Sequence, residues 1–242
     1  MLKKIENDFD VYKSVYLDIL PKFADEETDN KARILLENSL YLSAFTTFEN
    51  FLKELIKNYI ENIADTGITF FQLTDGFAES YFISQEKRIS SIFDNSDEKR
   101  KRAFSSYFKS IKATLEKKQL NSLIKFEFLH KNKLDGYYKD LFELMLGDRN
   151  FLSTIKLTEI KADFEGLLDV EGDAFTFLVE YTDKIRNSIA HENDKFQIES
   201  FFSFEKVVDA FYIIISKMIE KYEEHTGFRF EIKADNILDE LI

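Results

Sequence analysis

The sequence predicts an all-α protein, and three observations support this prediction. Only one Pro and seven Gly occur in 242 residues, so little turn chemistry is available for a many-stranded sheet, and helices can run long. Apolar residues recur every three or four positions over much of the chain, the spacing of one face of an α-helix. With 44% hydrophobic residues, a chain of this length can bury a core as one or two domains.

The N-terminal part is predicted to contain a short helix and a long one. Apolar residues from Ile5 to Ile19 follow a helical spacing that stops at Pro21. An acidic loop at 25–30 follows. The longest periodic stretch, about 30–64, then ends at Asp65-Thr-Gly. Its apolar face consists of Phe45, Phe48, Leu52, Leu55, Tyr59 and Ile63.

The middle of the chain is predicted to be a basic helical insertion, 66–170. Residues 66–97 lose helical periodicity and are interpreted as a long connection. Gly147 breaks the last long helix of this region. The helices are expected near 84–93, at about 98–117 and 119–145, and as one or two short helices within 150–170.

The C-terminal part is predicted to complete a helical bundle. Asp173 is a candidate N-cap for a helix that reaches about 190, with a core stripe of Leu178, Tyr181, Ile185 and Ile189. The last long helix spans about 200–224. Residues 228–233 alternate like a short strand, and 235–242 are expected to form a terminal helix or a docking tail. We therefore expect a single domain, 1–242, with a core of 30–64 and 173–224, the insertion 66–170 and a tail 228–242.

Charge is distributed unevenly along the chain. The net charge of −12 argues against binding a polyanion through the whole surface. Residues 98–139, however, hold twelve Lys/Arg and four Asp/Glu, so this block carries +8 and the remainder −20. The block opens with Lys99, Arg100, Lys101 and Arg102, which are candidate contacts to a nucleic-acid backbone. The alternative interpretation of each of these cations is a solvated helix face.

Composition also excludes several classes of site. Zero Cys rules out disulfides, thiolate nucleophiles and Cys-ligated zinc. The three His have no metal-ligand spacing, and there is no Gly-rich phosphate loop. We therefore expect no metal and no cofactor. No apolar run approaches the roughly 20 residues that span a membrane, and the N-terminus lacks the apolar core of a signal peptide, so a cytoplasmic location without membrane contact is expected.

The segment Lys184-Ile-Arg-Asn-Ser-Ile-Ala-His-Glu192 carries the candidate catalytic groups. Arg186 offers a planar, permanently charged fork for phosphate oxygens. The imidazole of a histidine can both take and give a proton near neutral pH, and His191 supplies this group. On a regular helix the two residues lie about 140° apart, but a long Arg side chain and a frayed helix end allow both to face one cleft. Asn187 adds an amide for a phosphate or a ribose hydroxyl. The alternative is that Arg186 pairs with an acid such as Asp183 and His191 satisfies a backbone carbonyl.

The Arg-Asn-x-x-x-His arrangement of Arg186, Asn187 and His191, in a helical chain, resembles the signature of the HEPN superfamily. The resemblance implies a metal-independent endoribonuclease in which the ribose 2′-OH attacks the neighbouring phosphorus, His191 assists proton transfer, and Arg186 stabilises phosphoryl charge. It further implies RNA as substrate, a homodimer with both motifs in one cleft, and a role in phage defence or as a toxin. An antitoxin or another defence protein is then a possible partner. HEPN toxins that are neutralised by adenylylation have a Tyr two residues after the motif His, whereas this chain has Asn193. This difference argues against an antitoxin that adenylylates this site, and it does not bear on catalysis.

A second part of the resemblance lies in residues 41–56, which look like the first core helix of HEPN nucleases of the RiboL-PSP and MAE-type groups. In those proteins an acidic residue between aromatics can face the active cleft. Glu49, between Phe48 and Phe51, is the matching position and is expected to orient His191 or Arg186 through a charge-assisted hydrogen bond. The alternative is an ordinary exposed helix Glu.

Two other functions remain open on the sequence alone. The chain can be a non-catalytic helical module that binds RNA or a partner protein, since inactive HEPN domains exist. It can also be a regulatory subunit of a defence system that docks through 228–242.

Overall fold

The computed structural model describes residues 2–23, 27–65, 90, 92, 97–115, 126–157, 172–192, 196, 198 and 203–231. Within these residues the protein is all-α, as predicted, and the β-structure consists of one isolated bridge between Lys156 and Asp173. The chain divides into two compact units. The first unit contains Met1–Glu54 and Glu127–Ile242, and the second contains Leu55–Phe126.

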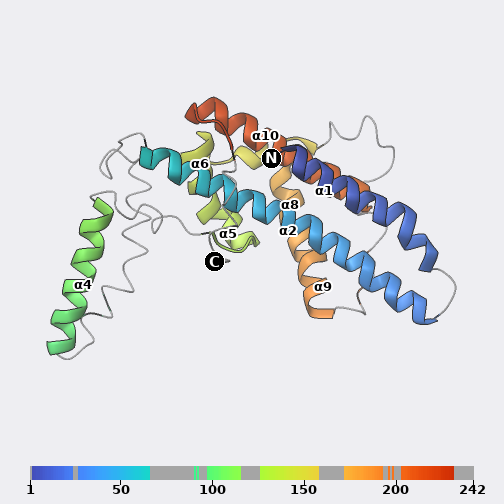
Figure 1. Ribbon diagram of the computed structural model, residues 1–242, viewed down its shortest axis with the longest axis horizontal. Coiled ribbons are helices and arrows are strands. Elements are labelled where there is room, and N and C mark those ends of the chain that lie inside the picture. The colour runs from blue at the N-terminus through green and yellow to red at the C-terminus, as the bar shows by residue number, and fades with distance from the viewer. Residues whose placement is uncertain are drawn as a thin grey trace, which may run out of the picture. The chain divides into compact units, whose positions relative to one another are not determined.

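The first helix, α1 (Leu2–Ser14), packs along the last long helix of the first unit (Figure 1). It buries Ile5 and Phe9, continues as a π-helical turn η1 (Val15–Ile19) and ends in a 3₁₀ turn η2 (Leu20–Phe23). Pro21 lies in this last turn, so the predicted end of the helical segment is confirmed. The first unit therefore begins with an amphipathic helix that ends at its proline.

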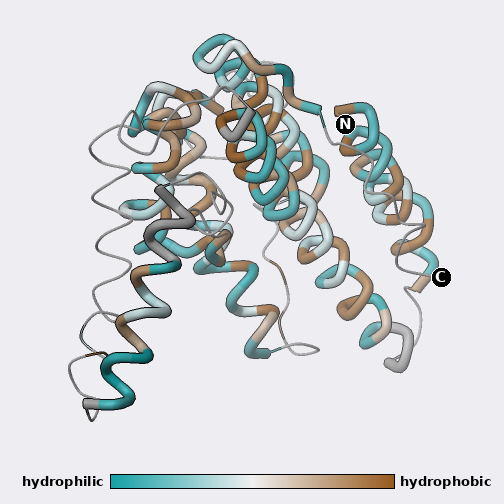
Figure 2. The backbone as a smooth tube through the Cα atoms, turned by 60° about the vertical axis from the view of Figure 1, so that its left-hand side comes forward, coloured by the Kyte–Doolittle hydropathy of each residue, from teal (hydrophilic) through white to brown (hydrophobic). Residues whose placement is uncertain are grey.

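The longest helix is α2 (Glu27–Asp65), which matches the predicted stretch of 30–64. All six residues of the predicted apolar face are 8% exposed or less. Figure 2 shows the hydrophilic and hydrophobic positions that alternate along it, as an amphipathic helix requires. The face expected from the sequence is the buried face of this helix.

An aromatic cluster joins α2 to two later helices of the first unit. These are α8 (Ala174–Tyr181) and α10 (Phe204–Thr226). Phe211 contacts the rings of Phe45, Phe48, Phe177 and Tyr181 at centroid distances of 5.1–6.2 Å. Edge-to-face and offset pairs of this kind add stability beyond the buried area. The cluster fixes α8 against α2, which positions the residues that follow α8.

Three short helices of the first unit replace part of the predicted insertion. They are α5 (Lys131–Asp135), α6 (Tyr137–Leu146) and α7 (Phe151–Thr154). The predicted single helix of 119–145 is wrong where the structure describes it, because 126–130 are not helical and Gly136 separates α5 from α6. Helix α6 packs on α10 and buries five of its ten residues. The segment from Glu127 onward thus shares the core of the first unit, whereas the expected insertion of 66–170 included it.

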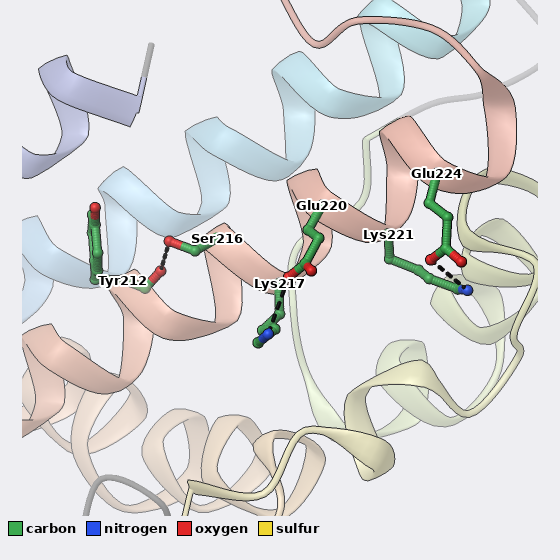
Figure 3. A network of polar contacts seen from close by, with 6 residues as sticks. All are labelled: Tyr212, Ser216, Lys217, Glu220, Lys221 and Glu224. Atoms are coloured by element: carbon green, nitrogen blue, oxygen red, sulfur yellow. Dashed lines mark hydrogen bonds and ion pairs between the residues drawn. The ribbon is translucent and has the colours of Figure 1, made fainter.

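The outer face of α10 is polar. Lys217 pairs with Glu220 at 3.0 Å, and Lys221 pairs with Glu224 at 2.9 Å, one turn apart (Figure 3). Glu223 also accepts a hydrogen bond from the backbone N–H of Phe230 at 3.0 Å. Residues 227–231 are therefore held against α10 in a non-helical conformation, and the strand predicted from 228 onward is absent from this described stretch. Apolar and polar residues alternate there because Phe230 is buried, at 8% exposed, and its neighbours Arg229 and Glu231 face solvent.

In the second unit the structure describes the end of α2 and helix α4 (Asp97–Leu115), close to the predicted 98–117. The predicted short helix of 84–93 and the tail of 235–242 fall outside the described residues except for residues 90 and 92. Across the described part of the chain, every helix is too short or too polar to cross a bilayer.

Candidate functional site

The candidate catalytic groups lie on a helix that is interrupted by a π-helical turn. Asp173 caps its start, since its carboxylate accepts a hydrogen bond from the N–H of Thr176 over 2.9 Å, as the sequence predicted. After α8 comes the π turn η6 (Thr182–Arg186), and α9 (Asn187–Glu192) continues from it. In Figure 1, α8 and α9 form one continuous path that crosses α2 and runs past it. Arg186 is the last residue of the π turn.

The local hydrogen bonds account for the wider turn. The N–H of Thr182 is shared between the carbonyls of Leu178 and Val179, and its hydroxyl donates to the carbonyl of Leu178 over 2.7 Å. The N–H of Asn187 then reaches back five residues to the carbonyl of Thr182. Single π turns of this kind occur frequently at functional sites. Here the turn changes the direction in which Arg186 and Asn187 leave the helix.

Glu49 of α2 lies close to this turn. Its carboxylate is half-buried and accepts a hydrogen bond from the backbone N–H of Leu129 over 3.3 Å. Burial raises the pKa of Glu49, and the Leu129 N–H and the nearby positive charge of Arg186 oppose that rise. Glu49 therefore lies within electrostatic range of Arg186, but among the described residues no hydrogen bond or ion pair joins it to Arg186 or His191, so the expected charge-assisted hydrogen bond is not formed.

Arg186 and Asn187 form a polar pair. Nη1 of Arg186 donates to Oδ1 of Asn187 over 3.1 Å, and both side chains are half-buried. Because Asn187 accepts through Oδ1, its amide NH₂ is left as a donor, and the guanidinium keeps further N–H groups. The pair thus presents several donors and no net negative charge, a combination suited to an anion.

His191 lies on the exposed side of α9. In the part of the chain that the structure describes, no hydrogen bond or ion pair joins it to Arg186. Asp183, the other partner considered for Arg186, is exposed and forms no ion pair with it among the same residues. The structure therefore brings Glu49, Arg186 and Asn187 together, and it presents His191 to solvent one helical turn later.

One part of the site was not predicted from the sequence. The segment 126–130 is anchored on both sides of Phe128: the hydroxyl of Tyr138 donates to the carbonyl of Glu127, and the Leu129 N–H donates to Glu49. Leu129 itself is 3% exposed, whereas the Phe128 ring is 69% exposed. A large apolar ring is thus held in solvent by a fixed backbone next to Glu49. In the sequence, the only indication of this exposed ring is an aromatic residue two positions before His130.

The predicted backbone-binding cations lie on α4 in the second unit. Lys99, Lys101 and Arg102 are exposed, and Arg100 is half-buried. Lys99, Lys101 and Arg102 therefore lie on a solvated helix face, which is the alternative interpretation given from the sequence. Among the described residues, no three His, Asp or Glu side chains gather in a group that can hold a metal ion.

Comparisons with known proteins provide no relative for this arrangement. No family model matches the chain, no curated protein is significantly similar to it, and no solved structure matches it significantly.

Proposed function

We propose that the protein is a metal-independent endoribonuclease of the HEPN type. The observation that carries this proposal is the placement of Arg186. It is half-buried at the end of a π turn, bonded to Asn187, within the field of Glu49 and one turn before the exposed His191. A cation fixed in this way binds a phosphate at little cost in conformational entropy.

The chemistry assigned to these residues is an internal transesterification. The ribose 2′-oxygen forms a bond to phosphorus, and the bond from phosphorus to the 5′-oxygen breaks. A His191 imidazole takes the proton of the 2′-OH, and a second proton is delivered to the leaving 5′-oxygen. In a homodimer, His191 of each protomer supplies one of these two steps. Arg186 and Asn187 stabilise the charge that develops on the non-bridging oxygens. The products are a 2′,3′-cyclic phosphate and a 5′-OH.

The experiment that tests the proposal is incubation of the purified protein with total RNA in EDTA, followed by end-group analysis. Wild type is expected to leave cyclic phosphate and 5′-OH ends. His191→Ala and Arg186→Ala are expected to lose about a hundredfold or more in rate. His225→Gln, which changes an exposed histidine of α10, and an oligonucleotide with a 2′-O-methyl group at the cut site serve as the protein and substrate controls. Equal cleavage by wild type and His191→Ala would reject the assignment.

A non-catalytic module that binds RNA or protein is the second candidate. It is favoured by the position of His191, which no hydrogen bond or ion pair links to Arg186 within the described residues. Under this proposal, which extends to a regulatory subunit of a defence system, the folded wild-type protein leaves RNA intact and the two substitutions leave binding unchanged.

A further inference from the structure

Helix α4 holds two phenylalanine rings in solvent. Phe104 and Phe108 are 55% and 60% exposed, whereas Tyr107 on the same helix is 8% exposed. The two rings are close to parallel, with an interplanar angle of 17° and centroids 6.4 Å apart. Exposed aromatic area of this kind carries an unfavourable hydration free energy, which a ligand relieves when it covers the rings.

Exposed cations flank this ring pair along the sequence of α4, and one of them shares its face. Lys99, Lys101 and Arg102 precede it, and Lys109 follows it. At 100° per residue, Lys101 falls within about 60° of both rings around the helix axis, whereas Arg102 and Lys109 lie about 100–160° away from the rings on another face of α4. Helix α4 as a whole contains six Lys/Arg and two Asp/Glu, a charge of +4 in a chain of −12. Figure 2 shows the hydrophilic first turns of α4 and the apolar positions that follow them.

We propose that α4 binds single-stranded nucleic acid, with bases stacked on Phe104 and Phe108 and a phosphate held by Lys101 on the same face of the helix. Stacked bases are parallel to one another, so two near-parallel rings can receive neighbouring bases of one strand. In a duplex the faces of the bases already cover each other, and only the phosphates remain for the cations. Aromatic rings combined with a positive groove or stripe are the features that bind single strands without base-edge recognition.

The chemistry of α4 matches other ligands less well. A helix that lies in a membrane interface needs a broad apolar face. On α4 the exposed positions of 98–109 include Ser105, Ser106 and four cations besides the two rings. An acidic peptide satisfies the cations but offers no flat surfaces for the parallel rings.

This binding does not depend on Arg186 or His191, so it can be tested apart from RNA cleavage. The chain has no Trp, and Phe104→Trp and Phe108→Trp therefore each create a single fluorescent reporter at the proposed contact. The probe is an oligothymidylate of about 12 nucleotides, within the usual range for single-strand sites. Its lack of 2′-hydroxyls prevents cleavage by the proposed chemistry.

The expected result is saturable quenching of both reporters, with an affinity that falls as salt rises. In a labelled-oligonucleotide assay, Phe104→Ala with Phe108→Ala should weaken binding at least about tenfold. Lys101→Gln should reduce the salt dependence. Leu17→Ala removes an exposed apolar side chain of the π turn η1, and Lys217→Gln removes an exposed cation of α10. These two controls should leave binding unchanged.

Three outcomes would overturn the proposal. One is an absence of quenching by oligothymidylate. Another is an affinity for a DNA hairpin duplex equal to that for the single strand, since stacking would then contribute nothing. The third is a blue shift of the reporters with anionic lipid vesicles, or a response to polyglutamate, that exceeds the response to the oligonucleotide.

Discussion

Burial of Glu49 raises the pKa of its carboxyl, and the guanidinium of Arg186, from a helix far along the chain, opposes that rise. The pair links α2 to the π turn of the candidate site. Because the carboxylate also accepts the N–H of Leu129, it connects three separate segments of the first unit. Because burial and these two neighbours act on the Glu49 carboxyl in opposite directions, its ionisation has a measurable effect on stability.

Glu49→Gln should make the protein slightly more stable at neutral pH. A raised carboxyl pKa means that the folded state binds the proton more tightly than the unfolded state. The free energy of unfolding of wild type therefore falls as pH rises from the ordinary value of 4.5 through the raised value. The neutral amide avoids this cost, while its oxygen still accepts from Leu129. After allowance for solvent screening at a half-exposed site, we expect a gain of about 0.5 kcal/mol.

Urea denaturation of both proteins at several pH values measures this difference. The two curves should converge as the pH falls below about 4. Glu220→Gln, which changes an exposed carboxylate paired with Lys217, is the matched control and should alter stability little. A Glu49→Gln protein that is less stable than wild type by the same amount at every pH would show that the charge itself carries no penalty.

Phe128→Ala should weaken RNA binding without affecting the fold, if the proposed nuclease activity is present. The ring is 69% exposed, so its removal costs little stability, but it offers a stacking face to a base beside the bound phosphate. We expect KM to rise about fivefold or more with a small change in kcat. Steady-state cleavage of a short RNA measures both constants, and Phe128→Trp should restore KM. A fall in kcat alone would argue against a stacking role.

Tyr181→Phe should destabilise the first unit by about 1 kcal/mol. The hydroxyl of this fully buried ring donates to the backbone carbonyl of Tyr41 over 2.8 Å and ties α8 to α2. Tyr212→Phe is the matched control, because that ring lies half-buried on α10 (Figure 3). Thermal or urea unfolding compares the two. Equal losses for both variants would mean that the bond to Tyr41 contributes nothing specific.

Gly147→Ala should destabilise the protein for two separable reasons. Gly147 has φ +69°, so an alanine there adds roughly 1 kcal/mol of backbone strain. A Cβ at this position would also lie 2.5 Å from Nδ1 of His225. In a double-mutant cycle, His225→Ala should recover the part of the loss caused by the steric conflict and leave the strain. Strict additivity of the two substitutions would show that the imidazole moves away freely.

Helices with one continuous apolar face could be predicted from the sequence. The face of α2 from Phe45 to Ile63, the cap at Asp173 and the break at Gly147 all follow from periodicity and end signals. The segment 126–130 could not be predicted, because its apolar residues fit a helical pattern as well as an anchored loop. Its conformation depends on the bonds of Glu127 to Tyr138 and of Leu129 to Glu49, which involve main-chain atoms.

The candidate site shows the same division. The sequence motifs indicate Arg186, Asn187, His191 and Glu49 as candidates, and Glu49 lies within electrostatic range of Arg186 without the hydrogen bond that was expected. The π turn was not, because Tyr181, Ile185 and Ile189 repeat every four positions, a spacing that α- and π-helical turns both accommodate. The direction of Arg186 therefore depends on hydrogen-bond geometry at Thr182 that no residue pattern specifies.

The π turn also affects the number of residues that the chain contains between α8 and α9. A turn closed over five residues contains one residue more than an α-helical turn, and here that surplus residue lies between Thr182 and Arg186. A homologous chain that lacked one residue at the exposed Asp183 would keep α8 and α9 in register and retain the spacing from Arg186 to His191. Its arginine would also keep its direction, because Arg186 directly precedes α9 and α9 stays in register. The π turn therefore lets the chain contain one residue more before the motif, and a single gap upstream of the motif is compatible with the same direction of the guanidinium.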